Sequence, residues 1–454
     1  MKRAPPLLPC NEAFIFYEPA CVIKIFKGFF MVRGATVLAS SRYGKFLSKP
    51  NSNSPNTSSA FSIESIQKIF GQTFSTATHV QLLWKGEDTF KTLFNAIEGA
   101  KRFICLQFYI FRDDDTGRAF SALLKKKAEE GVNVYILYDH FGSLGTPGRF
   151  WQEMKGAGIK VRASYPFKWT APLHYVHRDH RKLIVIDGKE AFTGGLNIAN
   201  EYSGFHLRKR RKGWRDTGIL LQGPIVKELF ETFKRSWHQW GGGKILLPQT
   251  DSISNKGKAD ISMDPPGPNG DRTLPVLPIF VYSKKGRRKM RSLLRYSVDH
   301  AASTIFLTTA YFTPSRSMIA ALEDAVKRGA RVRLLVPGQS DIPPASYAGK
   351  AFFSRLLKSG VEIFTYEGEM LHAKTYVFDQ RWSIIGSTNL DYQSLLYNDE
   401  GNVGILDTGV GEKMNEMFEA DLKNSVSIDL KTWSRRPFFE KIKEHFFALF
   451  RKRL

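Results

Sequence analysis

The chain has 454 residues, of which 42% are hydrophobic, an ordinary share for globular proteins that allows two or three domains with a sizeable core. Its 67 lysines and arginines outnumber 43 aspartates and glutamates, and the net charge of +24 favours a polyanionic partner, either nucleic acid or an anionic membrane surface. The three scattered cysteines, Cys10, Cys21 and Cys105, exclude a disulfide framework and a cysteine metal site, which indicates a reducing compartment.

Residues 1–60 form an N-terminal extension and linker that carries few acidic residues. Its most apolar window, residues 21–40, is interrupted by Lys24, Lys27 and Arg33, so it lacks the roughly 18 consecutive apolar residues of a membrane span. It also lacks a signal-peptide core followed by a cleavage site. We expect this segment either to associate with a membrane surface or to be a disordered or mis-started extension.

Two stretches with the same alternation of strands and helices follow. We expect a first domain over residues 61–247 and a second over 279–430, separated by a linker over 248–278 that is rich in Pro, Gly, Ser and Asp. The strand–helix–strand order predicts parallel strands joined by crossover helices, which is an α/β fold. The predicted strands cover residues 80–84, 103–111, 132–138, 304–309 and 332–336, and the predicted helices cover 87–100, 116–130, 315–328 and 352–358.

The last segment, residues 431–454, is basic and rich in aromatic residues. Residues 437–454 are predicted to form an amphipathic helix, because apolar side chains recur there at helical spacing. Such a helix either lies in a membrane interface or docks its apolar stripe onto the second domain. The stripe consists of Phe439, Ile442, Phe446, Leu449 and Phe450.

A polar motif occurs twice in the chain with identical spacing. One match would be unremarkable, but two matches in one register indicate a duplicated domain. The first copy is His180-Arg181-Lys182, four residues, Asp187, six residues, Gly194-Gly195-Leu196-Asn197; the second is His372-Ala373-Lys374, four residues, Asp379, six residues, Gly386-Ser387-Thr388-Asn389.

Each copy of the motif predicts a β-hairpin. Residues 183–186 and 376–378 are apolar strands, and Asp187-Gly188 and Asp379-Gln380 are turn sequences. Because alternate side chains of a strand point the same way, His180 and Lys182 project together, as do His372 and Lys374. The small pairs Gly194-Gly195 and Gly386-Ser387 are expected to let the backbone approach a ligand.

These residue types suit a phosphate ester. Lysine and the amides of Asn197 and Asn389 bind phosphate oxygens and offset the charge of the transition state. One neutral imidazole attacks phosphorus, and the other, when protonated, donates its proton to the leaving oxygen. One copy supplies only half of these groups, so a single site requires both copies.

A metal site is the weaker alternative. His174, His177 and His180 have H-x2-H-x2-H spacing, but no cysteine or acidic cluster lies near them in the sequence. We therefore interpret His174 and His177 as loop residues, and we expect neither a metal nor another cofactor.

The duplicated motif resembles the hallmark of the phospholipase D superfamily. The resemblance implies two homologous α-β-α sandwich domains packed face to face around one active site. It also implies that Asp216 and Glu400, which follow the two motifs, each accept a hydrogen bond from a catalytic histidine and fix its tautomer.

Within this superfamily the chain looks like the bacterial cardiolipin synthases over roughly residues 80–425. The resemblance implies phosphatidyl transfer between two phosphatidylglycerol molecules through a phosphohistidine, with His180 as nucleophile and His372 as general acid. One departure is Gln393, where the family usually has arginine. The resemblance rests on Phe108-Tyr109-Ile110-Phe111-Arg112-Asp113, Tyr138-Asp139, Asn197-Ile198-Ala199-Asn200-Glu201-Tyr202, Trp214-Arg215-Asp216-Thr217, Tyr311-Phe312-Thr313-Pro314 and Asn398-Asp399-Glu400.

Three other functions remain open at this stage. The same site would be a phospholipase D that releases phosphatidic acid if water replaced the alcohol. A nuclease would use the net charge of +24 on nucleic acid, and a lipid-binding protein without activity would require Gln393 to be disabling. We expect an anionic phospholipid surface as the partner rather than nucleic acid, with peripheral attachment to the cytoplasmic face of a bacterial membrane. The basic run 208–212 would attract its headgroups.

Overall fold

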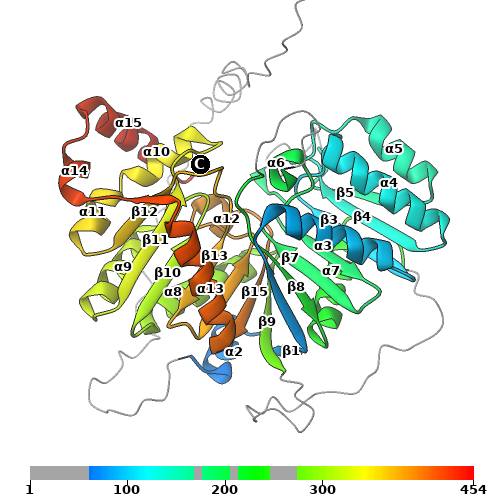
Figure 1. The fold of residues 1–454 in the computed structure, drawn as a ribbon, viewed down its shortest axis with the longest axis horizontal. Helices are drawn as coiled ribbons and strands as arrows, with labels where there is room; N and C mark the ends of the chain where they lie inside the picture. The colour runs from blue at the N-terminus through cyan, green and yellow to red at the C-terminus, as the bar shows by residue number, and fades with distance from the viewer. Residues whose placement is uncertain (1–60, 168–175, 205–212, 246–272, 454) are drawn as a thin grey trace, which may run out of the picture. The chain divides into compact units, whose positions relative to one another are not determined.

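The computed structural model describes residues 61–167, 176–204, 213–245 and 273–453. The predicted N-terminal extension, His174, the basic run 208–212 and most of the predicted linker lie outside these residues. Within the described ranges the chain forms two mixed sheets flanked by helices, so the predicted α/β fold is confirmed (Figure 1).

The first half contains a seven-stranded sheet in the order β2-β8-β7-β6-β3-β4-β5. Strands β3, β4 and β5 are parallel, as the strand–helix–strand pattern predicts, and the other pairs are antiparallel. The strands are β2 (His79–Leu83), β3 (Phe103–Phe108), β4 (Asn133–Asp139), β5 (Lys160–Ser164), β6 (Leu183–Ile186), β7 (Glu190–Gly194) and β8 (Gly218–Gln222). The helices are α3 (Gly86–Gly99), α4 (Asp115–Glu129), α5 (Gly148–Gly156), α6 (Asn200–Ser203) and α7 (Ile225–Gln239).

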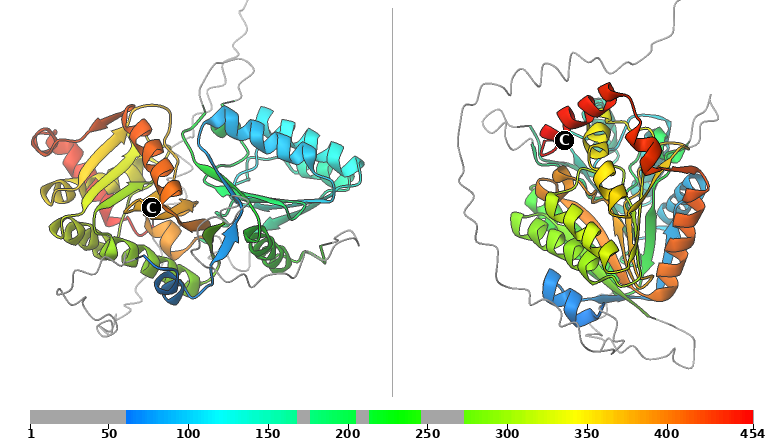
Figure 2. Two further views of the ribbon diagram at one scale, coloured as in Figure 1. Left: turned by 60° about the horizontal axis from the view of Figure 1, so that its bottom comes forward. Right: turned by 90° about the vertical axis from the view of Figure 1, so that its left-hand side faces the viewer.

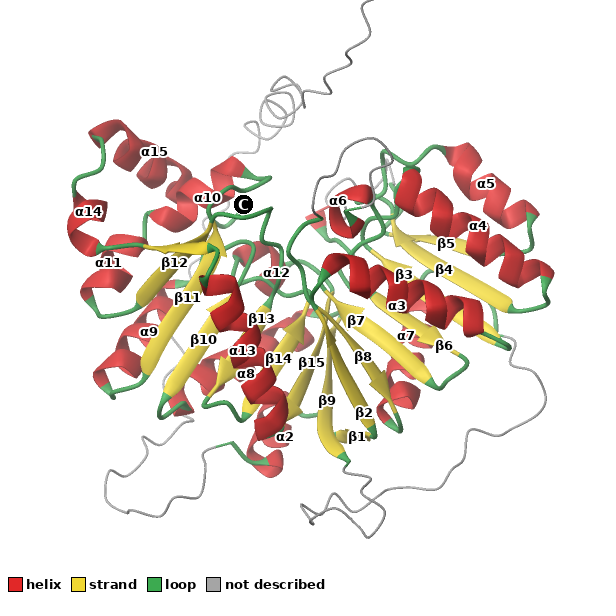
Figure 3. Cartoon of the chain, viewed as in Figure 1, coloured by secondary structure: helices red, strands yellow, loops and turns green. Residues whose placement is uncertain are grey.

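The second half repeats this order inside a nine-stranded sheet, β1-β9-β15-β14-β13-β10-β11-β12-β16, with one further strand at each edge (Figure 3). The strands are β1 (Ser75–Ala77), β9 (Leu274–Val281), β10 (Thr304–Thr308), β11 (Arg331–Pro337), β12 (Glu362–Tyr366), β13 (Thr375–Phe378), β14 (Trp382–Gly386), β15 (Glu400–Leu406) and β16 (Ser425–Ser427). The helices are α2 (Ile63–Phe70), α8 (Lys284–His300), α9 (Arg316–Lys327), α10 (Pro343–Lys350), α11 (Phe353–Lys358), α12 (Tyr392–Leu396), α13 (Thr408–Leu422), α14 (Leu430–Ser434) and α15 (Phe438–Leu449).

Three apolar clusters hold these layers together. One lies between the first sheet and α3, α4 and α5, and another lies between the second sheet and α2, α8, α9 and α11. The third cluster combines α7, α13 and side chains from both sheets, including Phe103, Phe230, Phe306 and Phe418. Because both halves contribute to this third cluster, they share one core.

The predicted domain boundaries differ from the structure at two places. Residues 61–77, assigned to the first domain, pack with the second: the ring of Phe61 lies 6.3 Å from that of Tyr296 on α8, and β1 pairs with β9. Strand β9 begins at Leu274, inside the predicted linker. A short edge strand such as β1 satisfies the exposed backbone groups of its neighbour, and nothing in its sequence indicates which sheet it joins.

The C-terminal segment also differs in extent from its prediction. The predicted helix over residues 437–454 is α15, which ends at Leu449, and it is preceded by the short helix α14. No helix among the described residues is long and apolar enough to cross a membrane.

The motif aspartates Asp187 and Asp379 hold the two predicted hairpins against the central strands. Both lie in turns with positive φ, at 54° and 53°, between β6 and β7 and between β13 and β14. Asp187 accepts hydrogen bonds of 2.8–2.9 Å from the backbone amides of residues 101–103 at the start of β3. Asp379 accepts bonds of 2.7–2.8 Å from the amides of residues 302–304 at the start of β10.

We therefore expect Asp379→Ala to lower the free energy of unfolding by about 1–3 kcal/mol, because three backbone amides lose an acceptor and alanine is strained at positive φ. Asp379→Asn, which keeps one acceptor oxygen and tolerates this conformation, should lose less. Urea denaturation of the two variants measures the difference. An unfolding free energy unchanged in Asp379→Ala would contradict this role.

Candidate active site

Two backbone bridges between the halves place each histidine beside an acid of the opposite half. The amide of His180 donates to the carbonyl of Asp399 at 2.9 Å, and the amide of Asp399 donates to Arg178 at 2.8 Å. The amide of His372 likewise donates to the carbonyl of Arg215 at 2.8 Å, and the amide of Arg215 donates to Met370 at 2.9 Å. Glu400 directly follows Asp399, and Asp216 directly follows Arg215, so each bridge brings one of these acids to the histidine of the other half.

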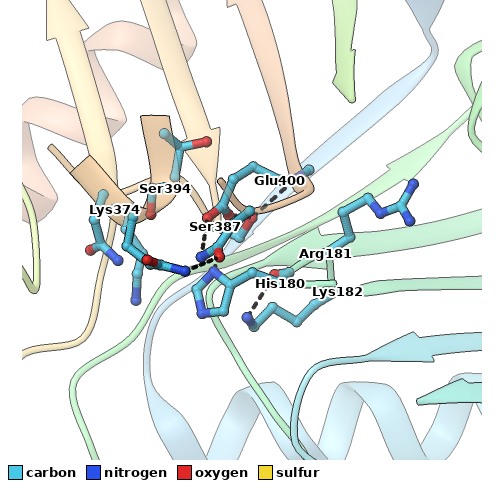
Figure 4. A network of polar contacts seen from close by, with 12 residues as sticks. His180, Arg181, Lys182, Lys374, Ser387, Ser394 and Glu400 are labelled. Carbon is cyan, nitrogen blue, oxygen red and sulfur yellow. Dashed lines mark hydrogen bonds and ion pairs between the residues drawn. The ribbon is translucent and has the colours of Figure 1, made fainter. Parts of the chain in front are cut away.

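The imidazole of His180 pairs with Glu400, which begins β15 in the second half. Nδ1 of His180 donates to Oε2 of Glu400 at 3.0 Å (Figure 4). The same oxygen accepts a short hydrogen bond from the hydroxyl of Ser387, and Oε1 accepts one of 3.3 Å from Asn398. Glu400 is fully buried and held from three sides, so it fixes the tautomer of His180.

The imidazole of His372 pairs in the same way with Asp216 of the first half. Nδ1 of His372 donates to Oδ2 of Asp216 at 2.6 Å, and Oδ1 accepts the amide of Thr217 at 2.7 Å. The rings of Tyr202 and Trp214 lie 5.4 and 5.5 Å from the His372 ring. Both histidines thus pair Nδ1 with an acid, so Nε2 is the nitrogen through which either imidazole would react.

The two motif lysines lie beside the histidines. Nζ of Lys182 donates to the carbonyl of His180 at 2.7 Å, and Nζ of Lys374 donates to the carbonyl of His372 through a short bond. Lys374 also lies 2.7 Å from Nδ1 of His372, where it competes with Asp216. We assign the Nδ1 proton to the Asp216 bond, because a carboxylate accepts it and an ammonium group does not.

Burial and neighbouring charges shift the pKa values of this cluster. Burial lowers the pKa of His372 to about 3, with a further decrease from Lys374, and burial also lowers the pKa of His180. Burial lowers the pKa of Lys182 to about 7 and that of Lys374 to about 8. Burial alone would raise the pKa of Asp216 and Glu400, but the adjacent lysines and histidines bring both below their ordinary values. The resting cluster therefore holds two neutral imidazoles and two carboxylates.

The structure thus brings His180, Lys182, His372, Lys374, Asp216 and Glu400 into one buried cluster. Asn197 and Asn389 lie behind it: Oδ1 of Asn197 accepts the amide of Ile110 at 3.0 Å, and Oδ1 of Asn389 accepts that of Tyr311 at 3.3 Å. One amide hydrogen of Asn197 is used by the hydroxyl of Tyr202 at 2.8 Å. Contact of either asparagine with a phosphate stays a prediction.

The small residues of the motif lie close to neighbouring protein atoms, and their approach to a ligand stays a prediction. A side chain at Gly195 would overlap the carboxylate of Asp216, and one at Gly386 would overlap Asn402 and the backbone of Gly401. Gly194 has a φ of 147° and lies against the backbone of Thr217. The backbone at these positions therefore comes close to the supporting acids and the neighbouring strand.

His177 takes no part in the cluster. Its Nδ1 lies 2.7 Å from the carbonyl of Tyr397, as suits a loop residue, and His174 lies outside the described residues. In the ranges that the structure describes, no three His, Cys, Asp or Glu side chains are grouped so as to hold a metal ion.

The geometry agrees with the comparison to known proteins. Residues 93–237 and 294–422 match the family described as cardiolipin synthase, PLD-like domain. A cardiolipin synthase of Geobacillus kaustophilus is 32% identical over 374 residues, which cover 82% of this chain and 71% of the relative. This chain belongs to the cardiolipin synthase family of the phospholipase D superfamily.

Two further comparisons extend this result. A probable cardiolipin synthase of Bacillus subtilis is 30% identical over 83% of this chain and 72% of its own length. The crystal structure of a phosphatidylserine synthase from Haemophilus influenzae has the same fold, with a TM-score of 0.63, 14% identity, and coverage of 86% of this chain and 99% of that chain. The two cardiolipin synthases show the family, and the crystal structure shows the fold alone.

Sequence reasoning missed a buried ionic cluster beneath the His180–Glu400 pair. The guanidinium group of Arg181 donates to Asp179 at 2.7 and 3.0 Å and lies 3.6 Å from Asp399, which also pairs with Arg287 at 3.1 Å. These acids directly precede His180 and Glu400. The signal was present, because Asp179 and Arg181 are alternate residues and point away from the face that carries His180.

Gln393, where the family usually has arginine, links the same region to the first half. Its amide nitrogen donates to the carbonyl of Val176 at 3.0 Å and to Oδ1 of Asn398 at 2.9 Å. Asn398 in turn donates to Glu400. A chain of hydrogen bonds therefore links Gln393 through Asn398 and Glu400 to His180, and we expect Gln393 to position that histidine.

We expect Gln393→Ala to lower kcat by about tenfold, the effect of losing roughly one net hydrogen bond that orients Glu400. Gln393→Arg, which can donate to the same two acceptors, should retain kcat within a few-fold. Steady-state kinetics with Gln222→Ala as the matched control measures this, since the side chain of Gln222 donates to Glu190 at 2.8 Å and lies on β8. Unchanged kcat and pH profile in Gln393→Ala would contradict the role.

Proposed function

We propose that this chain transfers a phosphatidyl group from one phosphatidylglycerol molecule to another through a phosphohistidine intermediate. The observation that supports it most directly is the crosswise pairing of His180 with Glu400 and of His372 with Asp216. The pairing gives one buried cluster two imidazoles with the same tautomer and two adjacent lysines. That set is what displacement at a phosphodiester requires.

The charge balance of the cluster supports uptake of one proton with substrate. With both lysines protonated, their charges offset the carboxylates of Asp216 and Glu400, whereas deprotonation of Lys182, whose pKa is about 7, leaves the cluster with one negative charge. A phosphodiester adds one negative charge, which raises the pKa of every neighbouring group and favours first a protonated Lys182 and then one imidazolium. One histidine is then the acid and the other remains the nucleophile.

The reaction proceeds in two displacements. Nε2 of His180 attacks phosphorus, the bond from phosphorus to the glycerol oxygen breaks, and the imidazolium of His372 gives its proton to that oxygen. Neutral His372 then takes the proton of the hydroxyl group of a second phosphatidylglycerol as its oxygen attacks. The bond between phosphorus and His180 breaks, and cardiolipin leaves. Two phosphatidylglycerol molecules thus give one cardiolipin and one glycerol, and His372 ends protonated as it began.

His180 is 7% exposed and His372 is 3% exposed, so bulk water has little direct access to the two imidazoles. We expect a phosphatidylglycerol hydroxyl bound at the site to compete with water as acceptor, with phosphatidic acid as the product of hydrolysis. We place the enzyme at the cytoplasmic face of a bacterial membrane, attached peripherally, because the substrate is an anionic phospholipid.

The experiment is to incubate the purified protein with labelled phosphatidylglycerol in mixed detergent micelles and to resolve the products. Cardiolipin with an equal yield of glycerol supports the transferase. Phosphatidic acid as the main product would make the enzyme a hydrolase. Turnover of neither lipid, together with cleavage of added DNA, would replace the proposal with a nuclease.

A further inference from the structure

Helix α15 packs on α10 through one face. Its Glu444 and Ala448 are buried, and the ring of Phe447 stacks on that of Tyr347 at 5.8 Å. Glu444 accepts an ion pair of 3.0 Å from Arg436 in the loop before the helix. The right-hand view of Figure 2 shows α15, in red, lying against α10, in yellow. The helix therefore docks on α10, but through Glu444, Phe447 and Ala448 rather than through the predicted apolar stripe.

The apolar stripe, for which the sequence left both a membrane interface and docking open, is largely exposed. Successive residues of an α-helix are rotated by about 100°, which puts the apolar side chains of α15 within an arc of about 100° centred opposite Glu444 and Ala448. We name these side chains the apolar face. They are Phe438, Phe439, Ile442, Phe446 and Leu449, with exposed fractions of 72%, 74%, 46%, 53% and 78%.

Basic residues surround the apolar face. Residues 431–454 contain eight lysines and arginines and two acidic residues, Glu440 and Glu444. Both acids are paired, Glu440 with Lys443 at 2.8 Å and Glu444 with Arg436 at 3.0 Å. The uncompensated charge beside the aromatic side chains is therefore positive.

The apolar face lies at the end of the sheet that carries the active site. The hydroxyl of Tyr311, whose ring is 6.3 Å from His372, donates to Asp341 at 2.8 and 2.9 Å. Asp341 is followed by Ile342, which is 41% exposed, and then by α10, on which α15 rests. Figure 3 shows the arrowheads of β11 and β12 directed toward α10 and α15.

The first half adds an exposed apolar residue at the corresponding edge. Leu144 follows the carboxyl end of β4 and is 58% exposed. At the carboxyl end of the neighbouring strand β3, the ring of Tyr109 lies 4.9 Å from that of His180. Exposed apolar side chains thus follow the strand ends near both catalytic histidines.

We propose that the apolar face of α15 inserts into the surface of an anionic phospholipid bilayer and holds the active site against it. Aromatic and aliphatic side chains enter the boundary between headgroups and acyl chains, and the surrounding lysines and arginines bind lipid phosphates. The choice of a phospholipid surface rests on the proposed function, whose substrate lies in that surface.

A second copy of the chain fits this face less well. A symmetric dimer through the apolar face would bring the same basic residues of both copies together around a small contact. Such like charges repel, whereas an anionic bilayer neutralises them.

The test is co-sedimentation of the full chain with vesicles of phosphatidylglycerol and phosphatidylcholine, or of phosphatidylcholine alone. The double variant Phe439→Ser/Leu449→Ser removes the two most exposed side chains of the apolar face. We expect it to bind the anionic vesicles at least about tenfold more weakly than the unaltered chain. The control Val426→Ser changes a side chain that is 57% exposed on β16 and should bind normally.

The outcomes separate this proposal from the proposed function. Unaltered activity of the double variant on phosphatidylglycerol in detergent micelles, with weakened vesicle binding, supports the membrane role of α15. Equal vesicle binding by the double variant, or no vesicle binding by the unaltered chain, overturns it. A dimer that the double variant abolishes, seen by analytical ultracentrifugation, overturns it in favour of self-association. Vesicle binding through α15 without cardiolipin formation would leave this inference standing and remove the proposed function.

Discussion

His180→Ala and His372→Ala should each lower the rate of phosphatidyl transfer by at least about 10⁴-fold, because each removes a group that both displacements of the proposed reaction require. The double variant is expected to be no slower than either single variant, since the two imidazoles act as one unit. Cardiolipin formation from labelled phosphatidylglycerol, measured over hours, checks all three variants. Substantial turnover in either single variant would refute a shared site.

The matched control for these variants is His300→Ala. Nδ1 of His300 lies 3.0 Å from the carbonyl of Tyr296 at the end of α8, and its ring is tilted against that of Tyr296 with the ring centres 4.0 Å apart. This variant also loses an imidazole but should retain activity. Circular dichroism and thermal unfolding of all variants separate loss of chemistry from loss of fold.

A substrate with an acidic leaving group assigns the two roles. A phosphatidyl nitrophenol ester needs no proton on its leaving oxygen, so it bypasses the general acid. With His372 as the acid, His372→Ala should release nitrophenolate in a single rapid burst, whereas His180→Ala should release none. The opposite pattern would exchange the two histidines and leave the shared site intact.

Glu400→Gln and Asp216→Asn are expected to lower kcat by about 10²-fold or more, because each leaves its histidine without the carboxylate that orients it. Each effect acts across the two halves. Glu400→Gln should perturb His180, and Asp216→Asn should perturb His372. Combining Glu400→Gln with His180→Ala should cost no more than His180→Ala alone.

The pH dependence of the reaction rate should show the direction in which each substitution shifts the pKa of its histidine. Burial lowers the pKa of His180, and the charge and hydrogen bond of Glu400 partly offset this decrease. Because Glu400→Gln removes that charge, we expect it to lower the pKa of His180 further. Asp216→Asn does the same to the pKa of His372. With His180 as nucleophile, Glu400→Gln moves the acidic limb of kcat/KM to lower pH. With His372 as an acid that is protonated only when substrate is bound, Asp216→Asn moves the alkaline limb of kcat to lower pH.

Nuclear magnetic resonance of the imidazole groups distinguishes direct pairing of Glu400 with His180 from a general structural role of Glu400. The Nδ1 proton of His180 should change its shift in Glu400→Gln, and that of His372 should keep its shift. A change confined to His372 in Glu400→Gln would contradict the crosswise pairing. Thermal unfolding of Glu400→Gln serves as the check on the fold.

Much of the central architecture could be predicted from the chain. The strands over 103–108 and 304–308 and the helices that follow them have strong apolar periodicity and clear ends, such as the glycines after α4 and α9. The paired hairpins followed from Asp187-Gly188 and Asp379-Gln380, whose backbone has positive φ in the structure. Local signals of this kind do not depend on distant partners.

The crosswise partners could not be predicted in the same way. Asp216 follows the His180 motif and Glu400 follows the His372 motif, so sequence order suggests pairing within each half. The bridges between Asp179 and Asp399 and between Arg215 and Leu371 reverse that order. Contacts between segments hundreds of residues apart leave no mark on local periodicity, which is also why the place of β1 was missed.

The path of β1 has a consequence for how the protein folds. The chain contributes this strand to the second sheet before it builds any of the first, and it returns to the second sheet only at β9. No cut at one point of the backbone therefore yields two intact halves. Because the first part of the chain contributes a strand to the second sheet, we expect the two halves to unfold in a single thermal transition.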